Sequence, residues 1–251
     1  MCYLCFMNQK MKVSDYLLNT IDRLPRGYVF TYTDFDIDVE SNEAVIKALN
    51  RMVVAGRIKK ISKGRYYKPE VTPYGDLEPD QWQVVKDLLE ENGKVVGYLT
   101  GYSIYNRLGL TTQLSHLIQI GKNTIRPSLK RGQYTISFIK QKNSITKENI
   151  PLLQILDTIR YIKKIPDTTI HNSCTRLLTI LKSLSQNENT TLVRLALKYP
   201  PSTRALLGAL LDNFLPEDTT ELLYKSLNHI TKYKFPDLQN VLPMANKWNI
   251  V

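Results

Sequence analysis

The chain has 251 residues, a length that suits two domains, and a net charge of +11 with a pI of about 9.4. With 43% hydrophobic and 23% charged residues, its composition is that of a globular protein and not of a disordered one. No apolar run is long enough to span a membrane. The excess of basic over acidic residues favours a polyanionic partner. A basic protein without such a partner would have the same composition.

The cysteine content indicates a reducing compartment. Three cysteines do not make a disulfide framework, and Cys174 lies in an apolar helical context typical of a buried side chain. Cys2 and Cys5 form a C-x-x-C pair, but without a second pair we expect no zinc site. We therefore expect a cytoplasmic protein. Residues 1–10 are expected to be a tail, because their apolar core is too short for a signal peptide.

Residues 11–69 are predicted to form a winged helix-turn-helix domain. Apolar residues at helical spacing predict a first helix over 12–24, and a strand-like run follows at 28–30. Thr33 is expected to cap a very short helix at 34–37. The order helix, strand, short helix is that of the first half of a winged helix.

The second half of this domain is a helix that runs into a hairpin. Apolar residues recur from Val45 onward at i, i+4, i+7 and i+8, which is one helical face. Ser41 is a good N-cap, and Gly56 stands where a C-cap glycine belongs. Two β-like runs, 57–62 and 65–68, then flank a Lys-Gly turn.

Charge is unevenly distributed within this domain. Residues 41–68 contain eight Lys/Arg and one acidic residue, a net charge of +7, whereas residues 12–40 have a net charge of −3. A helix fits the major groove of duplex DNA, and cations beside it meet the phosphates. We therefore expect Glu43, Lys47 and Asn50 to reach base edges and Arg51 to contact phosphate. The helix N-terminus should also contact phosphate, and the wing should meet phosphates or the minor groove. The predicted DNA-binding residues are Ser41, Asn42, Glu43, Lys47, Asn50, Arg51, Lys59, Lys60, Lys63 and Arg65.

The rest of the chain predicts an α+β protein. The stretch PEVTPYGDLEPD, with three prolines and four acidic residues, predicts a linker at 70–80. Residues 81–147 are expected to form a mixed α/β domain and residues 148–251 a helical C-terminal region. In the mixed domain we predict helices at 81–92 and 103–108 and strands at 95–99, 117–120 and 134–139. In the C-terminal region we predict helices at 148–164, 170–185, 190–198, 202–214 and 218–231.

The segment from Asn92 to Lys147 has nine Lys/Arg and no Asp or Glu. It predicts a second basic surface for nucleic acid or an acidic partner, and ordinary surface lysines are the alternative. Aromatic residues between the cations could stack on bases, but we expect them to belong to the core. The residues assigned to this second basic patch are Lys122, Arg126, Lys130 and Arg131.

No catalytic or metal site is predicted. The three histidines have no partner at ligand spacing, and the chain has neither a phosphate-cradling P-loop nor a G-x-S-x-G nucleophile. We therefore expect a protein without enzymatic activity and without a cofactor.

Two stretches resemble a known family. The run from Ser41 through AGRIKKISKGRYYKP resembles the winged-helix domain of AbiEi-type antitoxins of type IV toxin–antitoxin systems. GYLTGYSIYNRLGLTTQ and the strand after it resemble the post-linker domain of that group, including a branch known only as proteins of unknown function. The resemblance covers roughly residues 12–145.

This resemblance implies a cytoplasmic antitoxin that binds double-stranded operator DNA and represses its own operon. Its partner would be a nucleotidyltransferase-like toxin, neutralised through the C-terminal domain without necessarily forming a stable complex. Two alternatives from other classes stay open: a winged-helix adaptor that binds an acidic protein, and a nucleic-acid-processing enzyme in residues 81–147. A dimer on two half-sites and a monomer that binds cooperatively are both compatible with the sequence.

Overall fold

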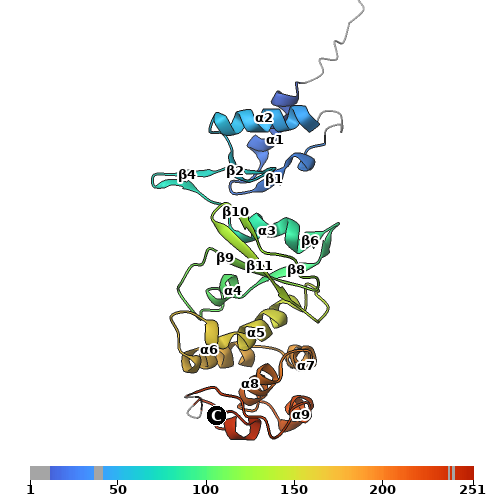
Figure 1. Ribbon diagram of the computed structural model, residues 1–251, viewed down its shortest axis with the longest axis vertical. Coiled ribbons are helices and arrows are strands. Elements are labelled where there is room, and N and C mark those ends of the chain that lie inside the picture. The colour runs from blue at the N-terminus through green and yellow to red at the C-terminus, as the bar shows by residue number, and fades with distance from the viewer. Residues whose placement is uncertain (1–11, 37–41, 237, 239–240) are drawn as a thin grey trace, which may run out of the picture. The chain divides into compact units, whose positions relative to one another are not determined.

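The computed structural model describes residues 12–36, 42–236, 238 and 241–251 (Figure 1). The chain divides into two compact units, Met1–Lys86 and Asp87–Val251. The predicted α+β class is confirmed: helices with small sheets come first, then a mixed four-stranded sheet, then helices. The predicted regions 81–147 and 148–251 are not separate units, because one continuous core joins them.

The first unit has the element order and sheet order of a winged helix. Its three strands pair antiparallel in the order β1-β3-β2. The predicted first helix, first strand, second helix and hairpin are all present. The elements are α1 (Val13–Arg23), β1 (Val29–Thr31), the 3-10 helix η1 (Tyr32–Asp34), α2 (Asn42–Val54), β2 (Lys59–Ser62) and β3 (Arg65–Tyr67).

The apolar faces of α1 and α2 form the core of this unit. Leu17 on α1 and Val45 and Leu49 on α2 are completely buried, against aromatic side chains of the sheet such as Tyr66. Gly56 ends α2 in the left-handed conformation, with a φ of 71°, which glycine adopts without steric cost. The helical periodicity of the sequence therefore predicted the core face correctly.

The short helix differs from its prediction. η1 begins at Tyr32, two residues before the predicted start, and its cap is Thr31 instead of Thr33. Thr31 and Asp34 form a capping box, in which the Thr31 N–H donates to Asp34 Oδ2 at 2.7 Å. The predicted end of this helix and the predicted cap Ser41 lie outside the described residues.

The predicted linker contains a second hairpin. β4 (Glu70–Thr72) and β5 (Gly75–Leu77) pair antiparallel as an isolated two-stranded sheet. Prolines exclude a central strand, but here they stand in the turn and outside the paired residues, where no ladder hydrogen bond is lost. Gly75, with a φ of 113°, closes the turn.

The second unit begins with the end of α3, followed by short strands and one short helix. The elements are α3 (Gln81–Leu89), which starts before the division, β6 (Glu90–Glu91), β7 (Lys94–Val95), β8 (Gly97–Thr100), α4 (Tyr102–Tyr105), β9 (Leu117–Lys122), β10 (Leu129–Arg131) and β11 (Tyr134–Lys140). The main sheet has the order β10-β11-β9-β8, with β11 parallel to β9 and the other pairs antiparallel. The sequence pattern predicted three of these four strands and missed β10.

The helix predicted at 81–92 is shorter than expected. α3 ends at Leu89 because Asn92 and Gly93 both have positive φ, which is the turn of the β6–β7 hairpin. Trp82 on this helix is 42% exposed. The buried face of α3 is formed by Val84, Val85, Leu88 and Leu89.

All five predicted C-terminal helices are present, with shifted ends. They are α5 (Ile150–Arg160), α6 (Ile170–Lys182), α7 (Gln186–Ala196), α8 (Pro201–Leu211) and α9 (Glu217–Lys225), with the 3-10 turns η3 (Ile162–Lys164) and η4 (Ala245–Trp248). α7 starts four residues early because Ser185 and Glu188 form a capping box. In the described part of the chain, no helix has the length and apolar character that crossing a membrane requires.

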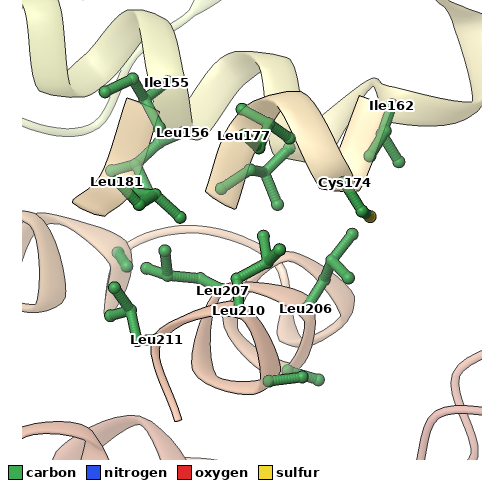
Figure 2. Close-up of a cluster of buried hydrophobic side chains, with 14 of the residues drawn as sticks. Ile155, Leu156, Ile162, Cys174, Leu177, Leu181, Leu206, Leu207, Leu210 and Leu211 are labelled. Atoms are coloured by element: carbon green, nitrogen blue, oxygen red, sulfur yellow. The ribbon is translucent and has the colours of Figure 1, made fainter. Parts of the chain in front are cut away.

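α5, α6 and α8 meet in the main core of the second unit (Figure 2). Leu156, Leu177 and Leu181 face Leu206 and Leu210 of α8 in this view, and all five are completely buried. Full burial of each such side chain contributes about 1.5–3 kcal/mol, so this helical layer is a main source of stability. Cys174 is buried in the same layer, as its apolar context predicted.

Candidate nucleic-acid interface

The outer side of α2 lines a groove of about 660 Å³ together with the start of α1. Lys47, Asn50 and Arg51 all contribute to this groove, as do the small side chains of Ser14 and Ala44. The structure therefore brings three of the predicted DNA-binding residues together on one exposed surface. Small residues beside them leave room for an incoming group.

Two contacts orient the polar side chains of α2. Lys47 Nζ lies 3.4 Å from Glu43 Oε2, one helical turn away, and both side chains are largely exposed. Tyr66 Oη on β3 lies 3.2 Å from Asn50 Oδ1 and donates a hydrogen bond to it. The wing thus fixes the Asn50 amide, and Glu43 partly compensates the charge of Lys47. Asn42, the first residue of α2, is half-buried.

The wing cations have unequal surroundings. Lys59 Nζ forms an ion pair with Asp76 Oδ2 of the second hairpin at 2.8 Å, and this hydrogen bond raises the pKa of Lys59. Lys60 Nζ lies 5.9 Å from the centre of the Tyr66 ring. Lys63 is exposed in the turn between β2 and β3, and Arg65 is half-buried on β3. Lys59 was predicted to contact phosphate, but a carboxylate engages it here because the assumed linker folds into a hairpin.

The second basic patch is smaller than predicted, because Arg131 is not on the surface. Its side chain is 4% exposed and donates to both carboxylate oxygens of Asp87, at 2.5 and 2.8 Å. Successive residues of a strand point to opposite faces, so β10 exposes Lys130 and buries Arg131. Lys122 is half-buried, with Nζ 3.4 Å from the Leu88 carbonyl oxygen. The Arg126 guanidinium lies 5.1 Å from the centre of the Phe138 ring.

The tyrosines of the acid-free segment belong largely to the core. Tyr98 and Tyr105 are buried, and Tyr134 is half-buried on β11. This agrees with the expectation that these rings pack inside the protein. Tyr98 has a further polar role in this core.

A buried carboxylate, Asp157 on α5, collects three hydroxyl donors. Tyr98 and Thr100 donate to Oδ2 at 2.7 and 2.8 Å, and Tyr199 donates to Oδ1 at 2.8 Å. Burial raises the pKa of Asp157, and the hydroxyl donors act in the opposite direction. The Gln141 amide in turn donates to the hydroxyls of both tyrosines, at 2.7 and 2.8 Å.

Sequence reasoning missed this network. Its one visible signal is a single acidic residue in the middle of the apolar helix IPLLQILDTIR. Among the residues that the structure describes, no three His, Cys, Asp or Glu side chains are grouped so that they could hold a metal ion.

These features define a two-unit α+β protein with an N-terminal winged helix and a helical C-terminal half. The chain belongs to DUF6088, a family of unknown function, whose sequence profile matches residues 16–192. The structure is similar to the crystal structure of the RV2827C protein from Mycobacterium tuberculosis, with a TM-score of 0.56 and 14% sequence identity. That similarity covers 89% of this chain and 85% of the other, and it concerns the fold alone. No functionally curated protein matches the sequence.

Proposed function

We propose that this protein binds duplex DNA with α2 and the wing and represses its own operon. The observation that carries the proposal is the groove along α2 that Lys47, Asn50 and Arg51 share. An exposed helix of this kind fits the major groove, where Asn suits adenine and Lys suits guanine. Lys63 in the wing turn supplies a cation for a flanking phosphate.

We further propose that it is the antitoxin of a type IV toxin–antitoxin system of the AbiEi type. The support is the resemblance of AGRIKKISKGRYYKP and GYLTGYSIYNRLGLTTQ to that family. In this proposal the protein is a cytoplasmic, non-enzymatic regulator. Its second unit counteracts a nucleotidyltransferase-like toxin without necessarily forming a stable complex.

A gel-shift assay with the DNA upstream of the gene tests operator binding. The double variant Lys47→Ala, Asn50→Ala should lose its preference for operator over unrelated DNA, because it lacks the two side chains assigned to base edges. The matched control is Lys182→Ala with Asn187→Ala, which removes the same two exposed residue types from the second unit. Unchanged operator binding by the first variant would refute the assignment of α2 to base reading.

The antitoxin role has its own test. We expect the neighbouring gene to encode a nucleotidyltransferase-like protein whose expression arrests growth, and co-expression of this chain should restore growth. The Lys47→Ala, Asn50→Ala variant should still restore growth, because toxin neutralisation is assigned to the second unit. If no neighbouring gene encodes a nucleotidyltransferase-like protein, the antitoxin proposal fails, and the proposal of a DNA-binding regulator stands without it.

One observation favours a second candidate function, a protein-interaction adaptor. The β4–β5 hairpin exposes the apolar side chains of Val71, Tyr74 and Leu77, and its Asp76 neutralises a wing cation. Val71 and Leu77 point to opposite faces of this hairpin, so it offers an apolar side chain on each face, and exposed large apolar groups are a feature of protein contacts. The adaptor predicts that the purified protein ignores duplex DNA even at low salt, whereas the regulator predicts strong binding there.

A further inference from the structure

A cavity of about 260 Å³ in the second unit is lined by four cationic side chains. They are Lys140, Lys142, Arg160 and Lys198, which share the cavity with Gln141 and Tyr199. None of the described residues that line it is acidic. The cations come from three places in the chain: the end of β11, the last turn of α5 and the connection between α7 and α8.

The four cations are exposed, but the backbone that carries them is held from inside. Lys140 and Lys142 flank the buried Gln141, whose side chain also accepts a hydrogen bond from the Asn143 N–H at 2.8 Å. Lys198 precedes Tyr199, whose hydroxyl is bonded to both Gln141 and Asp157. These bonds tie the end of β11 directly to the α7–α8 connection.

The helix that carries Arg160 is held by the same network. It follows Asp157 by three residues on α5, and Asp157 accepts the bonds from Tyr98, Thr100 and Tyr199. The buried polar cluster therefore fixes all three backbone segments relative to one another. A site whose backbone is held in advance loses less backbone entropy when it binds a ligand.

We propose that this cavity binds the phosphate chain of a di- or triphosphate ligand. Like charges around one concave site raise the local potential and attract anions of high charge. Arginine offers a planar fork to phosphate oxygens, and lysines act as point charges around it. The volume lies below the roughly 300–1,000 Å³ of pockets that enclose drug-sized ligands, so the site suits a phosphate chain better than a whole nucleotide.

A compact cavity fits a small polyphosphate better than a duplex. Duplex DNA presents its phosphates on a convex surface, spaced along its axis, and several of them cannot enter one small hollow together. The proposed ligand chemistry is therefore an inorganic polyphosphate or the phosphate chain of a nucleoside di- or triphosphate. This site is independent of the DNA-binding role proposed for the first unit.

Isothermal titration calorimetry of the full chain with inorganic tripolyphosphate, at 0.15 M salt, tests the proposal. We expect one saturable site per chain. The triple variant Lys140→Gln, Lys142→Gln, Lys198→Gln should bind at least tenfold more weakly. The control triple variant Lys147→Gln, Lys182→Gln, Lys232→Gln removes three exposed lysines of the same unit from outside the cavity and should bind like wild type.

Titrations with pyrophosphate, ATP and GTP identify the source of the phosphate chain. Equal affinities for tripolyphosphate and ATP would assign recognition to the phosphates alone, and tighter binding of ATP or GTP would identify a nucleotide. The absence of saturable binding, or equal weakening in both triple variants, would overturn the proposal. The proposal would also be overturned if wild type did not bind tripolyphosphate and the cavity variant bound duplex DNA more weakly than wild type.

A second comparison separates this proposal from the DNA-binding one. The Lys47→Ala, Asn50→Ala variant should bind tripolyphosphate as tightly as wild type, because both residues lie in the first unit. Loss of tripolyphosphate binding in that variant would place the anion site on the winged helix and refute the cavity assignment.

Discussion

Asp87, at the end of α3, holds the guanidinium of Arg131 on β10 through both of its carboxylate oxygens. The Arg131 side chain is 4% exposed, whereas that of Asp87 is 38% exposed. The pair joins the end of α3 to β10, an edge strand of the four-stranded sheet. Arg131 therefore has a structural role in place of the predicted contact to an anionic partner.

Removal of either partner of this pair should destabilise the protein. Asp87→Ala leaves a buried guanidinium without its carboxylate, which costs about 3–5 kcal/mol for buried pairs and less here because Asp87 is partly exposed. Urea denaturation measures the change in the free energy of unfolding. Lys130→Ala, at the exposed neighbouring position on β10, is the control and should change it by less than about 0.5 kcal/mol. Equal, small effects of both changes would contradict the structural role of the pair.

Release of Lys59 from Asp76 should strengthen DNA binding. Asp76→Asn removes the carboxylate that forms the 2.8 Å ion pair and frees one wing cation for phosphate. We expect higher operator affinity and a salt dependence whose slope, log K against log salt, steepens by about one unit. Asp22→Asn on α1 makes the same change in net charge without releasing Lys59. If both variants raise the affinity equally, the gain comes from net charge and not from Lys59.

Gly208 on α8 should not tolerate a side chain. A Cβ there would overlap the indole ring of Trp248, which packs against this helix and donates from Nε1 to Asp212 Oδ2 at 2.9 Å. Gly208→Ala should lower the free energy of unfolding by about 1–3 kcal/mol, as overpacking does. Adding Trp248→Ala removes the clash, so the double variant should lose less stability than the sum of the two single variants. If the stability losses of the two single variants simply add up in the double variant, the result contradicts a contact between position 208 and Trp248.

Asp157 should make stability depend on pH. Its folded pKa is raised above the ordinary value of 3.8, chiefly by burial, so the folded state binds the proton more tightly than the unfolded state. Its contribution is therefore complete below pH 3.8 and is lost as the pH rises through the folded pKa. In urea denaturation measured from pH 3.8 upward, the free energy of unfolding of Asp157→Asn should not show this decrease with pH.

Above the folded pKa of Asp157, where its carboxylate is ionised, the same variant should also be less stable than wild type. An amide NH₂ in place of one carboxylate oxygen would face hydroxyl donors, at a cost of about 1–3 kcal/mol. Asp167→Asn is a suitable control because Asp167 is exposed and its positive φ of 53° suits asparagine equally well. An unchanged pH slope in Asp157→Asn would show that another group causes it.

Cys174 should be inert in the folded protein. Burial raises the pKa of its thiol to about 12, and no atom of it is accessible to a reagent. In a Cys2→Ser, Cys5→Ser background, Ellman's reagent should modify Cys174 only at the rate at which the second unit opens. Guanidinium should then expose one thiol per chain. Immediate modification of the native protein would refute this burial.

Local patterns in the sequence determined much of the fold. The helical spacing around Val45 and Leu49 and the glycine at position 56 predicted α2 and its end, and the Lys-Gly turn predicted the hairpin of the wing. Apolar spacing also predicted all five C-terminal helices. Such patterns are reliable because hydrophobic periodicity and turn residues act over a few positions of the chain.

The failures of prediction have equally local causes. The isolated β4–β5 hairpin has too few residues for a clear alternation, and the prolines around it favoured a linker. The helix predicted to reach Asn92 stops at Leu89 because Asn92 and Gly93 form a hairpin turn. The Asn-Gly pair is a hairpin signal, but the prediction placed Asn92 in the helix. β10, with three residues, is too short to be recognised from its pattern.

The sequence by itself determined the winged helix, the α+β class and the concentration of positive charge in the chain. Only the tertiary structure decided which of those charges are available to a ligand. It pairs Lys59 with Asp76, buries Arg131 against Asp87, and gathers Arg160 and Lys198 with two lysines that follow the sheet. The physical reason is that a charge acts through its neighbours in space, and here those neighbours lie between 17 and 58 positions away along the chain.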